Sequence, residues 1–109
     1  MFIRTSAVYY LTRGFASAIT LFPFVLIGTR TPLTRRLVIH ERIHLRQQLE
    51  MLILPFYIWY LIEYLLRLLK FKNGNAAYLN ISFEREAYFN DLKKDYLNRR
   101  KLWAWISYL

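Results

Sequence analysis

The sequence predicts a mainly α-helical protein, with an α+β element in the form of a small strand or hairpin near the N-terminus. Three observations favour this fold class. A β-branched and aromatic stretch lies near the N-terminus, two long helical segments follow on either side of Pro55, and the turn signal Asn73-Gly74 precedes a third. The 109 residues correspond to a single domain, residues 1–109.

The N-terminal segment, residues 1–30, is expected to be apolar and extended. Between Arg13 and Arg30 the sequence "GFASAITLFPFVLIGT" is too short to span a bilayer as a helix, and Pro23 interrupts it. Its composition favours one or two buried extended segments, and a broken apolar helix is the alternative. Because Arg4 and Arg13 interrupt the apolar stretches, no cleavable signal peptide is expected.

Three helical segments and a C-terminal tail follow. Thr31 or Thr34 can cap the first helix, and Pro32 suits its first turn. Pro55 then kinks or turns the chain. The expected segments are a first helix at 33–54, an apolar helix at 55–70, a third helix at 76–98 and a basic, aromatic segment at 99–109.

The first helix contains both histidines of the chain, in "VIHERIHLRQQLE". At 3.6 residues per turn, His40 and His44 lie about 40° apart and one turn above each other. Both imidazoles can therefore reach one metal ion, and Glu41 lies near enough to act on a water that the ion holds. This H-E-x-x-H pattern predicts a Zn²⁺ site with His40 and His44 as ligands and Glu41 as the catalytic residue.

The rest of the composition is compatible with that site. Arg35, Arg42 and Arg46 project about 200° away from the histidines on a helical wheel, so their charges are turned away from a cation. The chain has no cysteine, so any metal must be bound by imidazole, carboxylate or water.

A third zinc ligand has to come from a carboxylate further along the chain. Glu50 follows at the spacing of a third histidine ligand, but Gln47 replaces the glycine that would turn the chain back. Glu63 can reach the site only if the chain reverses at Pro55, and its other role is a salt bridge with Arg67.

The third helix offers Glu84 and Glu86, which differ by about 200° in a helix, so only one can face the metal. We prefer Glu84 because Ala77 on its face allows close helix packing and Asp91 can orient a ligand histidine. Glu63 and Glu86 remain alternatives. The zinc-site helix is expected to pack against this later, glutamate-bearing helix.

The two motifs together resemble a known family. "HERIH" followed by "EREA", an E-x-x-A pattern, resembles the gluzincin zinc metallopeptidases, and the chain length is similar to their minimal single-domain forms. The resemblance implies that His40, His44 and Glu84 bind zinc. It also implies that Glu41 is the general base and acid in the hydrolysis of a peptide or protein substrate.

The sequence departs from the family pattern in two places. Tyr88 follows Ala87 where many such families have an aspartate, which leaves Asp91 as the acidic residue beside a ligand. No further histidine is present to stabilise an oxyanion, so Tyr78, Tyr88 or an arginine is the candidate. The extended segment near Ile19 could also pair with a substrate backbone, although a core strand is the default.

Membrane association is expected from two segments. Met51 to Leu69 contains only two charges, and the C-terminal "RRKLWAWISYL" places Trp103 and Trp105 beside basic residues, as at a membrane interface. A cytoplasmic protein with a buried central helix is the alternative. The net charge of +9 is scattered among apolar residues without a nucleic-acid-binding motif, which argues against nucleic acid as a partner.

A non-catalytic function is the other reading of the sequence. The chain would then be a membrane-associated subunit or interaction protein that keeps a zinc-binding helix pair for structure. The coordination of the metal separates the two, because a water ligand indicates catalysis and a fourth protein ligand indicates a structural site.

Overall fold

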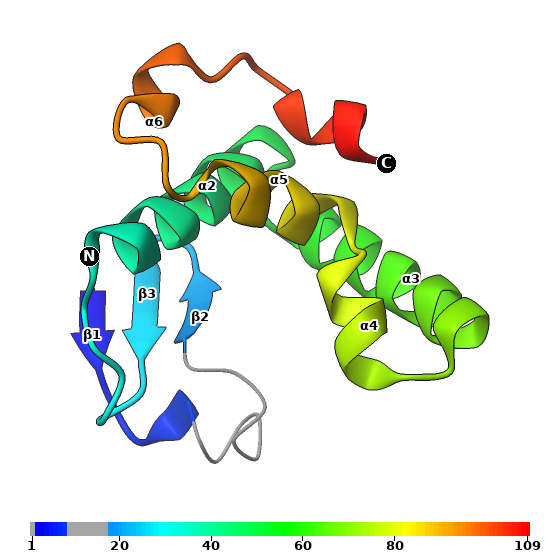
Figure 1. Ribbon diagram of the computed structural model, residues 1–109, viewed down its shortest axis with the longest axis horizontal. Helices are drawn as coiled ribbons and strands as arrows, with labels where there is room; N and C mark the ends of the chain where they lie inside the picture. Colours follow the sequence, from blue (N-terminus) through cyan, green and yellow to red (C-terminus); the bar gives the residue numbers. More distant parts are fainter. Residues whose placement is uncertain (1, 9–17) are drawn as a thin grey trace.

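The computed structural model describes residues 2–8 and 18–109 (Figure 1). It is mainly helical with a small sheet near the N-terminus, which confirms the predicted fold class. Gly14 and Arg13, at the start of the predicted extended stretch, lie outside the described residues.

The sheet has three short strands. They are β1 (Phe2–Arg4), β2 (Ala18–Leu21) and β3 (Phe24–Ile27). Their order is β1-β3-β2, with β1 parallel and β2 antiparallel to β3. Within the stretch between Arg13 and Arg30, residues 18–27 therefore form a hairpin that turns at Pro23, and β1 also lies within the segment 1–30 that was expected to be extended. One edge of the sheet is β2, which packs against α2.

The helix that carries the histidines is α2 (Arg35–Glu50), which lies across the sheet in Figure 1. The Thr34 hydroxyl caps it by accepting a hydrogen bond from the Leu37 backbone N–H at 3.1 Å. The helix starts two residues later and ends four residues earlier than the predicted 33–54. Leu52 and Ile53, both with positive φ, form the turn that ends it.

The next helix, α3 (Leu54–Phe71), leaves this turn at 113° to α2. Pro55 lies in its first turn, where a missing N–H breaks no helical hydrogen bond. The chain therefore turns just before the proline. Among the described residues, no single helix combines the length and apolarity needed to cross a bilayer; α2 and α3 reach them only as a bent pair.

The region predicted as one helix at 76–98 is divided. It contains α4 (Gly74–Leu79), α5 (Ser82–Asn90) and α6 (Tyr96–Arg99), and a 3-10 helix, η1 (Ala104–Tyr108), follows. The first break occurs at Ile81, which has extended dihedral angles. Glu63 of α3 holds this break, because its carboxylate accepts hydrogen bonds from the backbone N–H and the hydroxyl of Ser82.

Two clusters of buried side chains position α5. Ala87 of α5 packs without exposure against Ile39 and Ile43 of α2, and this contact confirms the predicted packing of the two helices. On the other side, Phe83 packs with Phe56 of α3 and with the C-terminal Trp105. Contacts with α3 and with the C-terminal segment thus keep α5 packed against α2, the helix that carries the histidines.

Candidate metal centre

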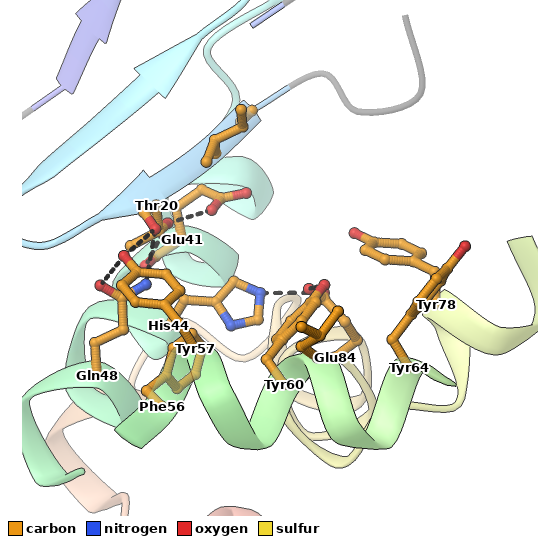
Figure 2. Close-up of a pocket in the computed structure, with 13 residues that line it drawn as sticks. Thr20, Glu41, His44, Gln48, Phe56, Tyr57, Tyr60, Tyr64, Tyr78 and Glu84 are labelled. Carbon is orange, nitrogen blue, oxygen red and sulfur yellow. Dashed lines mark hydrogen bonds and ion pairs between the residues drawn. The ribbon is translucent and has the colours of Figure 1, made fainter. Parts of the chain in front are cut away.

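A cavity of about 490 Å³ lies between β2, α2 and α3 (Figure 2). Polar groups from the predicted site line it, together with an apolar and aromatic wall from α3 and α4. The wall residues are Phe56, Tyr57, Tyr60, Leu61, Tyr64 and Tyr78. Glu41, His44 and Glu84 face this space.

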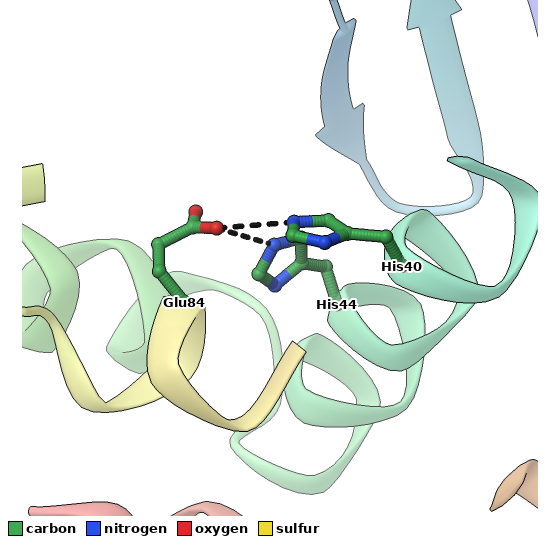
Figure 3. A group of neighbouring side chains, drawn as sticks. All are labelled: His40, His44 and Glu84. Atoms are coloured by element: carbon green, nitrogen blue, oxygen red, sulfur yellow. Dashed lines mark hydrogen bonds and ion pairs between the residues drawn. The ribbon is translucent and has the colours of Figure 1, made fainter. Parts of the chain in front are cut away.

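Three of the predicted residues converge beside the cavity (Figure 3). The Oε1 atom of Glu84 on α5 lies 3.2 Å from Nε2 of His40 and 3.1 Å from Nε2 of His44, both on α2. All three side chains are buried, and their ligand atoms lie within 4.8 Å of one another. The structure therefore brings two imidazoles and one carboxylate to a common point.

The other ring nitrogen of each histidine is already engaged. Nδ1 of His40 lies 3.0 Å from the Asp91 carboxylate, which can only accept, so this nitrogen donates. Nδ1 of His44 lies 2.8 Å from Oε1 of Gln47. The amide nitrogen of Gln47 donates to Glu86 at 2.9 Å, which turns its oxygen towards His44. Both Nε2 atoms of the neutral rings therefore present lone pairs to Glu84.

Three acceptors that face one another need a positive charge between them. Tyr60 donates to the second oxygen of Glu84 at 2.8 Å and leaves the first free for the histidines. Protons on the imidazoles can satisfy this arrangement, and so can a cation. The donor set of two imidazole nitrogens and one carboxylate oxygen fits Zn²⁺, which is commonly bound by three such ligands in catalytic sites.

The contacts within the cluster raise the pKa of His44 and lower the pKa of Glu84. Burial lowers the pKa of His44, but the negative charge and hydrogen bond of Glu84 outweigh burial and raise it to about 9. Burial would raise the pKa of Glu84, yet the charge of His44 and the hydrogen bonds from both histidines hold it well below its usual range. The site thus favours a carboxylate next to positive charge.

Glu41 is also buried, but its carboxylate does not belong to the group formed by His40, His44 and Glu84. Its Oε2 accepts a hydrogen bond of 2.5 Å from the hydroxyl of Thr20 on β2. The sheet therefore fixes the orientation of this carboxylate through a direct contact, and Figure 2 shows Thr20 next to Glu41.

The tyrosines of the site were predicted only in part. The hydroxyls of Tyr78 and Tyr88 lie 3.0 Å apart, and the ring of Tyr88 packs edge-on against His40. Burial is the main cause that raises the pKa of both, so their hydroxyls stay protonated at neutral pH. Tyr60, which contacts Glu84 directly, was not predicted because it lies in an apolar helix without a motif of its own.

The two alternative ligands are used elsewhere. Glu63 accepts from Ser82 and, at 2.8 Å, from the indole N–H of Trp59, and these contacts replace the predicted salt bridge with Arg67. Glu86 points to the other side of α5, where Nε of Arg100 donates to it at 2.5 Å. Neither carboxylate belongs to the group formed by His40, His44 and Glu84.

Arg100 forms a second polar centre that sequence reasoning missed. Its side chain is 2% exposed and also donates two hydrogen bonds to Glu50, at 2.9 and 3.0 Å. Burial lowers its pKa, but hydrogen bonds and charges of the two glutamates raise it above its usual range. A contact between residues 50 positions apart leaves no local pattern in the sequence.

The edge of β2 is partly covered. The side-chain amide of Gln48 donates to the Thr20 carbonyl at 2.7 Å and accepts from the Phe22 N–H at 2.8 Å. It therefore occupies part of the edge that an added substrate strand would use. Ala18, Ile19 and Thr20 of the same strand also line the cavity.

Comparison with known proteins adds no family to this geometry. No protein-family model matches the chain, and neither a curated protein nor a solved structure matches it. A function therefore has to be argued from the chemistry of the site.

Proposed function

We propose that this chain is a zinc-dependent metallopeptidase whose Zn²⁺ ligands are His40, His44 and Glu84. The observation that carries the proposal is the convergence of the Nε2 atoms of two histidines and one carboxylate oxygen, in a cluster whose other polar atoms already have partners. Three protein ligands leave a fourth position for water, which is the arrangement of a catalytic zinc site.

The residues of the chain then have distinct roles. Zinc, when bound, supplies a Lewis acid that lowers the pKa of water and polarises a carbonyl. Glu41, oriented by Thr20, takes a proton from the attacking water and passes it to the leaving nitrogen. The hydroxyl of Tyr78, which lines the cavity, is a donor for the oxyanion, and Tyr88 positions it through their mutual hydrogen bond. The aromatic wall suits an apolar side chain of a peptide or protein substrate.

Metal analysis tests the ligand set. Wild-type protein purified without chelator is expected to hold one zinc per chain, and Glu84→Ala is expected to lose it. Glu63→Ala is the matched control, since it removes another buried carboxylate that faces Ser82 instead of the histidines. Circular dichroism shows whether each variant is folded. Loss of zinc from folded Glu63→Ala alone would overturn the assignment of Glu84.

Hydrolysis of a fluorogenic peptide library tests the chemistry. Glu41→Gln is expected to keep zinc and to lose at least about 100-fold in turnover, because the amide cannot accept the proton. Turnover at the wild-type rate would remove Glu41 from the mechanism. A zinc-loaded wild-type protein that hydrolyses nothing and shows a fourth protein ligand would instead support the non-catalytic subunit.

A further inference from the structure

The acidic side chains of this protein are turned inwards. All seven lie among the described residues, and six are buried: Glu41, Glu63, Glu84, Glu86 and Asp91, with Glu50 held by Arg100. Only Asp95 is exposed, with a side-chain exposure of 63%. Most described lysines and arginines are at the surface, so the charged side chains exposed on the described part of the chain are almost all cationic.

One helix presents an apolar row on this cationic surface. Seven aliphatic side chains of α3 are 45–75% exposed; they are Leu54, Ile58, Leu61, Ile62, Leu65, Leu66 and Leu69. The only acid of the helix, Glu63, is buried on its other side. We call this row the α3 face. It follows a helix of 18 residues, about 27 Å long, and a continuous row of this kind marks an interaction site more often than scattered exposed leucines do.

Aromatic and basic side chains flank the α3 face. Trp59 of α3 lies 6.0 Å from Trp105, which lies 6.2 Å from the exposed Trp103, measured between ring centroids. The C-terminal segment thereby adds further exposed apolar side chains beside the first half of α3. Lys70 and Lys72 are exposed at its other end. Tryptophan and lysine next to an aliphatic face are typical of a helix that lies in a membrane interface.

We propose that the α3 face docks on a lipid bilayer whose headgroups are anionic, with α3 lying in the plane of the interface. Charge complementarity selects this occupant. Anionic headgroups attract the surrounding lysines and arginines, while the acyl chains cover the aliphatic row. A second copy of the chain would bring two cationic surfaces together, and a nucleic acid would leave the leucines and isoleucines uncovered.

The α3 face also borders the cavity of the candidate metal centre. Leu61 lines that cavity and is 57% exposed, so it belongs to both surfaces. A docked molecule would hold the cavity next to the bilayer. Docking itself does not depend on zinc, because none of the metal-centre residues belongs to the α3 face.

Vesicle flotation of the full chain tests the docking. Wild-type protein is expected to float with vesicles of phosphatidylcholine mixed with phosphatidylglycerol and much less with phosphatidylcholine alone, and binding should fall as salt rises. Leu66→Glu is expected to weaken the apparent affinity at least about tenfold, because a charge replaces an exposed leucine that the acyl chains would cover on docking. Leu33→Glu, at a residue 53% exposed outside α3, makes the same change in charge and should retain binding.

Three results would overturn the proposal. The first is wild-type protein that does not bind the phosphatidylglycerol vesicles, and the second is equal loss of binding in both variants with unchanged circular dichroism. The third is a wild-type dimer, measured by light scattering, that Leu66→Glu converts to a monomer without any vesicle binding. That result would assign the α3 face to contacts between copies of the chain. Zinc content and hydrolysis, measured in parallel, report on the metal centre independently.

Discussion

Glu84 and Glu86 lie two residues apart on α5 and are both buried, yet they have opposite surroundings. Glu86 meets the guanidinium of Arg100, which is positively charged at every pH at which proteins are folded. Glu84 meets two imidazoles, whose charge depends on pH or on a bound ion. Gln47 joins the two centres, since it donates to Glu86 and accepts from His44.

This difference separates stability from function within one short helix. A buried carboxylate destabilises a protein unless a positive charge or several hydrogen bonds accompany it. The chain provides Glu86 with a permanent cation. It provides Glu84 with the Nε2 atoms of two histidines, a donor set that a divalent metal would complete under the proposed function. The first carboxylate is therefore expected to govern folding, and the second is expected to govern metal binding.

The largest expected effect comes from Arg100→Met, which removes the cation of the Glu86 centre. Glu50 and Glu86 would then remain buried without their positive partner. Loss of one partner of a buried ion pair typically lowers the free energy of unfolding by about 3–5 kcal/mol. Urea denaturation monitored by circular dichroism measures this change.

The neighbouring arginine provides the control for that variant. Arg99 pairs with Asp95 at the surface, where both side chains are more than half exposed. Arg99→Met is therefore expected to change the free energy of unfolding by less than about 1 kcal/mol. Equal destabilisation by the two variants would contradict a special role of the buried Arg100.

A smaller effect is expected when pH changes the charge of His44. Its pKa is raised from 6.5 to about 9 in the folded protein. In the presence of a chelator, the corresponding stabilisation is complete below pH 6.5 and is lost as pH rises through about 9. The free energy of unfolding should fall by up to about 3 kcal/mol across this window.

Saturation with zinc should reverse this trend. Zinc binds the unprotonated imidazole, so the stabilisation that zinc adds grows as pH rises over the same window. Urea denaturation at pH 6.5 and pH 9, with chelator and with zinc, measures both slopes. His44→Gln should flatten the slope in chelator, which separates His44 from other groups that titrate near pH 9. Equal slopes with and without zinc would show that the histidine is not a ligand.

The sequence was sufficient for the parts of this comparison that depend on one helix. The spacing of His40, Glu41 and His44 within α2 determines which side chains share a face, and the structure brings both histidines to one carboxylate. The 200° between Glu84 and Glu86 likewise needs only local helical geometry. Asp91 directly follows the last residue of α5, so helical geometry also predicts its position, and its carboxylate contacts His40.

The sequence was not sufficient where distant segments determine the local structure. The predicted continuous helix fails at Ile81, where a carboxylate from α3 caps the start of α5. Ala77 consequently lies in α4 and not in the helix that carries Glu84. Arg100 contacts Glu50, which lies 50 positions earlier in the chain, and Tyr60 of α3 donates a hydrogen bond to Glu84 of α5. Such contacts depend on tertiary packing, which overrides the periodicity of a single segment.

The smallest of the three effects is expected from Asp91→Asn, which changes the partner of a ligand while the ligand itself stays in place. Asp91 accepts from Nδ1 of His40 at 3.0 Å and also pairs with Arg36. Loss of its charge makes the imidazole a weaker ligand, so zinc affinity should fall about 10–100-fold. Competition with a chromophoric chelator measures the affinity. Asp95→Asn removes an exposed carboxylate four residues along and should leave zinc affinity unchanged. If Asp91→Asn had no more effect on zinc affinity than Asp95→Asn, the hydrogen bond between Asp91 and His40 would serve folding alone. The surroundings of Glu84 would then no longer support its assignment as the metal-binding carboxylate of α5.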